Sequence, residues 1–193
     1  MSALPEKRWT VEEYLAFERA SEERHEFING QIYLMSGASR KHNLIVFNLA
    51  LALGNQLRGK GCETYLNEMR VKIPSTNNYT YPDVTIVCGE DAELEDDEFD
   101  TLLNPILIVE VLSPSTENYD RGKKFQSYRT LASLREYVLV SQDKQQIEHY
   151  IRQDDGQWLL SDTTDIDAIV TLPSINCTLK LADVYENINF EAE

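Results

Sequence analysis

A near-continuous aliphatic run, PILIVEVL, spans residues 105–112 and contains a single carboxylate, Glu110. Such a run is typical of a strand that is buried on both faces of a sheet. An unpaired carboxylate in that environment is energetically costly, so the fold must supply a partner for it. Because side chains alternate along a strand, Glu110 shares one face with Ile108 and Leu112. Strand ends of this kind present the sites of α/β sheets, which makes Glu110 a candidate functional residue.

A second carboxylate, Asp83, follows Pro82 at the beginning of another β-rich segment, YPDVTIV. Pro82 favours an extended conformation there, which fixes where the carboxylate emerges. Two carboxylates on neighbouring strands could hold Mg²⁺, a hard cation that prefers oxygen ligands and retains water. Two other interpretations stay open. Glu110 could be the buried partner of an Arg or Lys, and Asp83 could cap the beginning of a strand or a loop.

Local signals along the chain predict a mixed α+β fold. Thr10 and Glu13 form a capping box that begins a short helix ending near Ala20. Asn29-Gly30 predicts the two-residue turn of a hairpin from about His25 to Met35. The segments that follow are expected to form a buried helix over 42–58 with Gly59 as its cap, strands at 63–66, 69–73, 83–87 and 105–112, a helix over 117–131 and a strand over 137–140.

We expect a single domain over residues 1–193. An accessory layer at 10–35 would precede a core at 42–140, ordered helix, three strands, helix, strand, and a β extension would follow at 145–185. The polar segment STNNYTYP is expected to be a loop between strands.

The composition favours a folded protein in the cytoplasm. Apolar residues make up 42% of the 193 residues, close to the globular norm. The most apolar stretch, 44–53, is too short for a membrane span, and the N-terminal segment MSALPEKRW has no apolar leader. The three cysteines are widely spaced and form no CxxC pair. We therefore expect neither a disulfide framework nor a zinc site, and interpret them as small buried hydrophobic residues.

The charge is strongly acidic and unevenly distributed. The formal net charge is -15, and the run EDAELEDDEFD at 90–100 supplies eight acids and no base. Residues 121–135, by contrast, include five Arg or Lys residues and no acid. We interpret the acidic run as a solvated loop, with a phosphate-mimicking or self-masking segment as the alternative. The net charge argues against a nucleic-acid binder that depends on a broad basic surface.

Several phrases resemble a known nuclease family. In order they are EFINGQIYLMSGAS followed by His42, then YPDVTIV, NPILIVEVLSPST, DRGKKFQSYR and LREYVLV. Over about Thr10 to Tyr185 the chain resembles the Uma-two endonuclease family of the PD-(D/E)XK superfamily. The resemblance implies a restriction-endonuclease-like fold and an endonuclease that hydrolyses DNA with water activated by Mg²⁺, or alternatively Mn²⁺. A catalytically weak or inactive module that binds protein or nucleic acid is the alternative function.

The catalytic lysine is where the sequence departs from the superfamily pattern. That lysine is expected two residues after Glu110, where this chain has Leu112. In the resembled family it is displaced to the next helix, where Lys123 and Lys124 compete. At 100° per residue, Lys124 lies about 50° from the centre of the apolar side and Lys123 about 150° away. We expect Lys124 to face the sheet and assist catalysis, with a snorkelling surface lysine as the alternative. The apolar side is defined by Phe125, Tyr128, Leu131 and Ala132.

The resemblance also implies the remaining site residues. The expected metal ligands are Asp83, Glu110 and the Val111 carbonyl, with Glu26 as an outer ligand or water acceptor. A hairpin Glu is as commonly a surface partner across the strands, so that alternative for Glu26 stays open. His42 could contact a phosphate, orient a carboxylate or be structural. Phosphate contacts are expected from Arg121, and further from Arg129 and the loop near Lys41. A homodimer is expected by analogy with nucleases of this fold.

Overall fold

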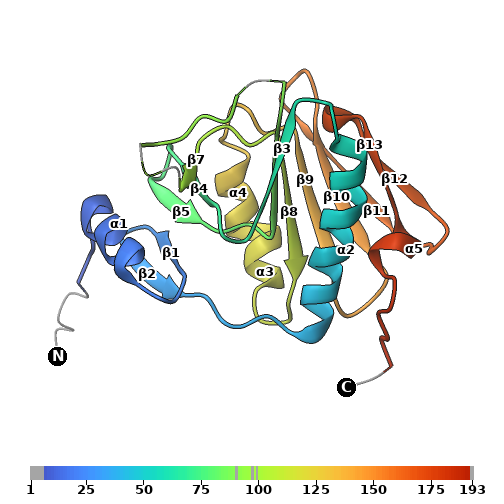
Figure 1. The fold of residues 1–193 in the computed structure, drawn as a ribbon, viewed down its shortest axis with the longest axis horizontal. Helices are drawn as coiled ribbons and strands as arrows, with labels where there is room; N and C mark the ends of the chain where they lie inside the picture. The colour runs from blue at the N-terminus through green and yellow to red at the C-terminus, as the bar shows by residue number, and fades with distance from the viewer. Residues whose placement is uncertain (1–6, 90, 97, 99, 192–193) are drawn as a thin grey trace.

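A six-stranded mixed sheet forms the centre of the computed structural model, which describes residues 7–89, 91–96, 98 and 100–191 (Figure 1). Its strand order is β11-β10-β9-β8-β6-β3. The strands are β3 (Cys62–Leu66), β6 (Val84–Cys88), β8 (Leu107–Leu112), β9 (Glu136–Ser141), β10 (Ile147–Arg152) and β11 (Trp158–Thr163).

The core follows the predicted order of helix, three strands, helix, strand. Helix α2 (Arg40–Leu57) precedes β3, β6 and β8, which pair antiparallel to one another. A helical segment then returns the chain to β9, which runs parallel to β8. One predicted core strand, 69–73, belongs elsewhere, because β4 (Arg70–Ile73) pairs in a second sheet.

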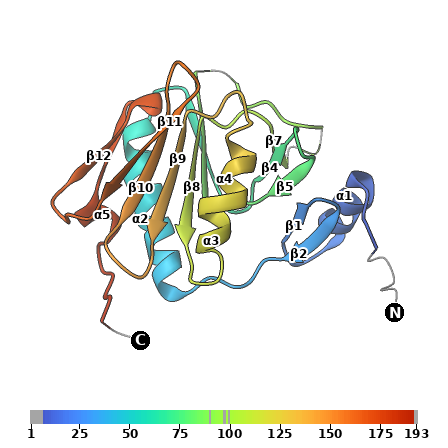
Figure 2. The same cartoon turned by 180° about the vertical axis from the view of Figure 1, so that it is seen from behind.

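The two faces of the central sheet are covered by different helices (Figures 1 and 2). Val109 and Val111 of β8 face α2, whose Ile45, Leu49 and Leu53 lie in the same buried cluster. Ile108 and Leu112 pack on the opposite face with Phe125 and Tyr128. Glu110 therefore shares the face of the second helical segment, as strand alternation predicts.

Helix α2 is less buried than its sequence indicates. It begins after Ser39, whose hydroxyl accepts the backbone N–H of His42, and ends before Gly59, which adopts a positive φ of 73°. Its outer face exposes Phe47 and Leu51, with Phe47 61% exposed. The prediction of a helix buried on most sides is therefore wrong for this face. Within the described ranges, no helix has both the length and the apolar character needed to cross a membrane.

The helix predicted over 117–131 is divided into three short pieces. Helix α3 (Glu117–Tyr119) leads into a π-helical turn at Asp120–Lys124, and α4 (Phe125–Tyr128) completes the segment. A π turn holds one extra residue per turn, and such turns are common at functional sites. Lys124 is buried and Lys123 is exposed, so the predicted choice of face is correct despite the irregular helix.

A second, five-stranded sheet carries the N-terminal layer, in the order β2-β1-β5-β4-β7. It comprises β1 (His25–Ile28), β2 (Gln31–Leu34), β4, β5 (Asn78–Thr80) and β7 (Thr101–Leu102), and helix α1 (Val11–Ala20) packs beside it. The capping box of Thr10 and Glu13 and the positive φ angles of Asn29 and Gly30 are as predicted. The predicted STNNYTYP loop is wrong, because β5 is a buried strand paired with both β1 and β4.

The β extension after β9 is confirmed, and its elements lie within the predicted range 145–185. Strands β10 and β11 widen the central sheet, and a separate hairpin of β12 (Ile169–Leu172) and β13 (Cys177–Lys180) follows. This hairpin, a 3-10 turn (Pro173–Ile175) and helix α5 (Leu181–Val184) pack with α2 in one cluster.

Two of the three cysteines form a disulfide, which corrects the prediction that none would. Cys62 and Cys88 are directly opposed on β3 and β6, with their Cα atoms 4.2 Å apart, and they form a disulfide bond. Cys177 is free and buried, as expected. The two cysteines are 26 residues apart in the sequence, and they meet because of the register in which β3 and β6 pair. The spacing of the cysteines does not reveal this register.

The acidic run does more than face solvent. Glu95 pairs with Lys72 and accepts a hydrogen bond from Tyr79. Asp100 lies 2.5 Å from the buried guanidinium of Arg70 and also pairs with Arg19. Burial alone would raise the pKa of Asp100, but the hydrogen bonds from Arg19 and Arg70 lower it. The prediction of a solvated loop is wrong for these residues, while positions 90, 97 and 99 lie outside the described ranges.

Replacing Asp100 with Asn should destabilise the protein, because the buried Arg70 would lose its counter-charge. Loss of one partner of a buried pair costs about 3–5 kcal/mol, and we expect the lower end because Asp100 is partly exposed. The control Asp96→Asn removes a more exposed ion pair with Arg19, keeps an oxygen that can accept from the N–H of Glu98, and should cost less than about 1 kcal/mol. Urea unfolding followed by circular dichroism measures both. Equal losses would contradict the importance of the Arg70 pair.

Candidate active site

A cavity of about 980 Å³ lies between the β1-β2 hairpin and the C-terminal end of β8. In both ribbon views the hairpin stands beside the central sheet on the side of α3 (Figures 1 and 2). The cavity collects ionisable side chains from elements far apart in sequence. Those used below are Glu26, His42, Asp83, Glu110, Asp120, Lys123 and Lys124.

Lys124 and Glu110 form the centre of this cavity. The Nζ atom of Lys124 lies 2.9 Å from Oε1 of Glu110, 3.2 Å from Oε1 of Glu26 and 3.6 Å from Oδ1 of Asp120. Lys124 is 6% exposed and Glu110 4%, so little water competes for these contacts. The hydroxyl of Tyr128 also donates to Oε1 of Glu110, at 3.0 Å. The Glu110 carboxylate is therefore held from two sides.

Asp83 is positioned next to Glu110 by the pairing of β6 with β8. Val84 pairs with Val109, so Asp83, one residue earlier on the antiparallel strand, comes level with Glu110. The backbone N–H of Val111 donates to Oδ2 of Asp83 at 2.7 Å, and Nε2 of His42 lies 3.0 Å from its Oδ1. Ser39 fixes the first turn of α2 and with it His42. Of the roles open to His42, the structure favours orienting a carboxylate.

The buried charges shift one another's pKa values. Burial raises the pKa of Glu110, and the charges of Asp120 and Asp83 raise it further, outweighing the opposing effect of Lys124. Burial also raises the pKa of Asp120. Burial alone would lower the pKa of Lys124, but the charges of Glu110 and Glu26 outweigh this and raise it. The cavity thus holds more carboxylates than one ammonium group can neutralise.

The structure brings most of the predicted site residues together. Glu26, His42, Asp83, Glu110, Val111 and Lys124 all line the cavity. Arg121 does not. Its guanidinium pairs with Glu117 and Glu148, so its charge is already neutralised away from the cavity. Lys123, by contrast, lies on the cavity wall and is exposed.

Two residues of the site were missed by sequence reasoning. Asp120 is buried beside Lys124, and Tyr128 supports Glu110. Both were accessible in principle, because Asp120, Lys124 and Tyr128 follow one another at intervals of four and so share one side of a helix. The hydroxyl of Tyr128 also lies 2.9 Å from that of Thr80 on β5, a contact that required the unpredicted strand.

The donor set fits a hard divalent cation. Carboxylate and carbonyl oxygens from Asp83, Glu110 and Val111 are the ligand types that Mg²⁺ prefers. In the part of the chain that the structure describes, no three His, Cys, Asp or Glu side chains converge closely enough to hold a metal without other ligands. Such a cation would therefore depend on two carboxylates, a backbone carbonyl and water, which is usual for Mg²⁺.

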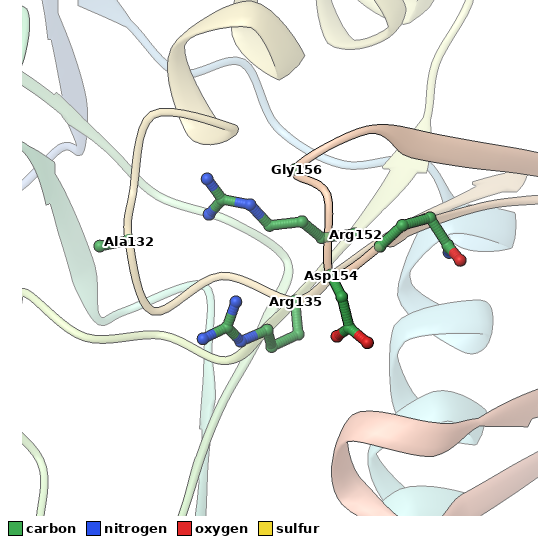
Figure 3. Close-up of a pocket in the computed structure, with 6 residues that line it drawn as sticks. Ala132, Arg135, Arg152, Asp154 and Gly156 are labelled. Carbon is green, nitrogen blue, oxygen red and sulfur yellow. The ribbon is translucent and has the colours of Figure 1, made fainter.

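A second pocket, of about 570 Å³, is lined by residues just before β9 and at the end of β10 (Figure 3). Because β9 runs parallel to β8, this is the end of the central sheet opposite to the C-terminal end of β8. Arg135 and Arg152 extend side by side from its wall, with Asp154 nearby. Arg152 donates to the carbonyl of Leu131 and packs over Trp158, so it stabilises the turn before β9. None of the predicted site residues lines this pocket. The buried ionisable groups single out the cavity beside β8 as the candidate active site.

Comparison with known proteins identifies what the chain resembles. The profile of a family named Uma2, described as "Putative restriction endonuclease", matches residues 11–182. Two uncharacterized proteins of Synechocystis sp. are similar. One, slr1290, is 38% identical over 186 residues, covering 96% of both chains. The other, sll1609, is 39% identical over 153 residues, covering 79% of this chain and 86% of its own.

A solved structure shares the fold. The crystal structure of a "putative nuclease belonging to DUF820" from Anabaena variabilis superposes with a TM-score of 0.75. The alignment covers 91% of this chain and 97% of the other, at 20% sequence identity. At that identity the likeness concerns the fold alone. The predicted fold class, a mixed α+β nuclease fold, is thereby confirmed.

Lys124→Met should destabilise the protein strongly, since it leaves Glu110 and Glu26 close together without a cation. Removing one partner of a buried ion pair costs about 3–5 kcal/mol. The neighbouring control Lys123→Met alters an exposed side chain and should change the free energy of unfolding by less than about 0.5 kcal/mol. Urea unfolding of the two variants tests this. A Lys124→Met protein as stable as wild type would contradict the central role of this ammonium group.

Proposed function

Because the chain belongs to the Uma2 family of putative restriction endonucleases, we propose that it is a metal-dependent endonuclease that hydrolyses phosphodiester bonds of DNA. One observation carries the proposal. The carboxylates of Glu26, Glu110 and Asp120 surround the buried ammonium group of Lys124, and Asp83 lies beside Glu110 in the same cavity, which is open to solvent. This excess of buried negative charge is what a divalent cation would offset.

The metal would be held by Asp83, Glu110 and the Val111 carbonyl, with Glu26 as an outer ligand. Mg²⁺ is the expected ion, because the donors are all oxygens. When bound, such a cation lowers the pKa of its water and stabilises negative charge on a phosphoryl group. Asp83 enters this arrangement already oriented by His42 and by the N–H of Val111. Partners of this kind fix the direction of a ligand's lone pairs.

Lys124 would supply the second positive charge of the site. Its ammonium group stays protonated beside Glu110 and Glu26, and an N–H of Nζ can hydrogen-bond to a phosphate oxygen, polarising the phosphate, or to the attacking water, orienting it. Asp120 and Glu26 hold Nζ in place. The proposed nucleophile is water, because the Ser113 hydroxyl hydrogen-bonds to Ser115 and Thr116, and among the described residues the His42–Asp83 pair of the cavity has no hydrogen bond to either serine.

Glu110→Gln and Asp83→Asn should each abolish nicking of a supercoiled plasmid in Mg²⁺ or Mn²⁺. Losing a residue that only orients a metal ligand costs about 10–100-fold, so losing a ligand itself should cost at least about a hundredfold. Glu63→Gln, on the exposed surface of β3, is the matched control and should nick like wild type. EDTA should stop nicking by the wild type and the control alike.

The contrary outcomes are distinct. Nicking that survives in Glu110→Gln would contradict the proposed centre. Binding of DNA by wild-type protein without nicking of any plasmid would favour the alternative function, a module that binds without turnover.

His42→Ala should weaken metal binding without removing it. Loss of the His42 contact frees the Asp83 carboxylate to rotate, and such losses lower metal affinity about 10–100-fold. Isothermal titration with Mg²⁺ and Mn²⁺ measures this against wild type, with Glu110→Gln as the reference for a lost ligand. An unchanged dissociation constant in His42→Ala would show that Asp83 is not oriented by His42.

A further inference from the structure

The β1-β2 hairpin has two chemically different faces. In its register Phe27 is opposite Ile32, and both pack on α1 in a cluster with Tyr14. Glu26 is opposite Tyr33, and directly opposed side chains in an antiparallel pair lie on the same face. Glu26 reaches Lys124, so this face is turned toward the candidate active site. Tyr33 is therefore presented to the same cavity.

The hairpin gives the cavity an apolar wall next to its charged centre. Ile28, Tyr33, Leu34 and Met35 all line the cavity. Tyr33 is 49% exposed and Leu34 58%, which is unusual for large apolar side chains gathered in one place. The hydroxyl of Tyr33 donates a hydrogen bond to the side-chain oxygen of Gln31 at 2.6 Å. The aromatic ring of Tyr33 lines the cavity, where it can contact a bound molecule.

The charges around the cavity do not suit a rigid double helix. Duplex binders obtain most of their affinity by neutralising phosphates with Lys and Arg. Here the net charge is -15, Arg24 on the cavity wall is paired with Glu68, and Arg121, outside the wall, is paired with two carboxylates. Lys123 is exposed on the wall, but one lysine neutralises little of a polyanion. Affinity for a polyanion must then come in large part from contacts that are not electrostatic. Stacking of a base on an aromatic ring is such a contact.

We propose that the cavity takes an unpaired nucleic-acid strand and that the ring of Tyr33 stacks on a base next to the scissile phosphate. The proposal rests on the proposed function, since Glu110 and Lys124 locate that phosphate. Bases within a duplex already stack on one another, whereas unpaired bases offer a free face to an aromatic side chain. The buried centre also requires a phosphate to enter a recess, which a flexible single strand does more readily than a duplex.

The experiment measures binding separately from cleavage. Glu110→Gln protein is titrated in Mg²⁺ into fluorescently labelled oligonucleotides, and anisotropy is recorded. The probes are a single strand, a fully paired duplex of the same sequence and a duplex with a central unpaired loop. We expect the single strand and the loop to bind about tenfold more tightly than the duplex. Wild-type protein in EDTA repeats the comparison, in case the variant is poorly folded.

Variants of the hairpin assign the effect to the ring. Tyr33→Ala should weaken single-strand binding about tenfold, and Tyr33→Phe should retain it, because stacking needs the ring and not the hydroxyl. Phe47→Ala removes an aromatic side chain that is also exposed but lies outside the cavity, and it should bind like the parent protein. Thermal melting checks that each variant is folded.

Three results would overturn the inference: equal or tighter binding of the duplex, unchanged binding by folded Tyr33→Ala, or no binding to any probe. Failure of the proposed function gives a different pattern. A wild type that binds single strands through Tyr33 but cleaves neither plasmid nor single strand would leave the inference standing and reject the hydrolase. A wild type that nicks plasmids and prefers duplex would do the reverse.

Discussion

The 2.9 Å contact between Lys124 and Glu110 lies where water scarcely reaches, and much of the architecture follows from making that contact tolerable. A carboxylate in the middle of a fully buried strand must be paired and hydrogen-bonded, or it is costly. Tyr128 supplies the hydrogen bond, and the π-helical turn before it brings both Asp120 and Lys124 against β8. Replacing a buried ion pair by hydrophobic residues of similar volume is often neutral or stabilising, so stability alone does not account for these charges.

The second sheet also supports the Lys124–Glu110 pair, because it carries Glu26 to Lys124. Strand β5 joins the hairpin to β4, and through that connection Glu26 reaches Lys124 from a part of the chain nearly a hundred residues away. The acidic loop holds the other end of this sheet in place, because Asp100 neutralises the charge of Arg70 on β4. A run of acids that looks like a repulsive surface is partly an internal counter-charge. The accessory layer is thus a wall of the site and not an appendage.

Sequence reasoning succeeded where the signal was local. The strand around Glu110, the Asn29-Gly30 turn and the buried face of Lys124 each follow from a few neighbouring residues and a known periodicity. It failed where the outcome depended on which distant strands pair. Strand β5, the Cys62–Cys88 bond and the pairing of Arg121 with Glu148 are all set by long-range contacts. The polar composition of β5 made it look like a loop. Its Asn78 is nevertheless buried, and its side-chain oxygen accepts a hydrogen bond from the backbone N–H of Asn29 in the hairpin turn.

The pairing of Arg121 bears directly on how an acidic protein could approach a polyanion. The basic segment at 121–135 suggests a phosphate-binding surface, yet Glu117 and Glu148 neutralise its first residue. Long-range attraction is then weak, and recognition must be achieved at short range, inside the cavity. There the ingredients are complementary: carboxylates suited to a divalent cation, a protonated lysine and an exposed aromatic wall. If the proposed function holds, such a site would select ligands by fit within the recess, and binding would depend less on ionic strength than it does for a basic surface.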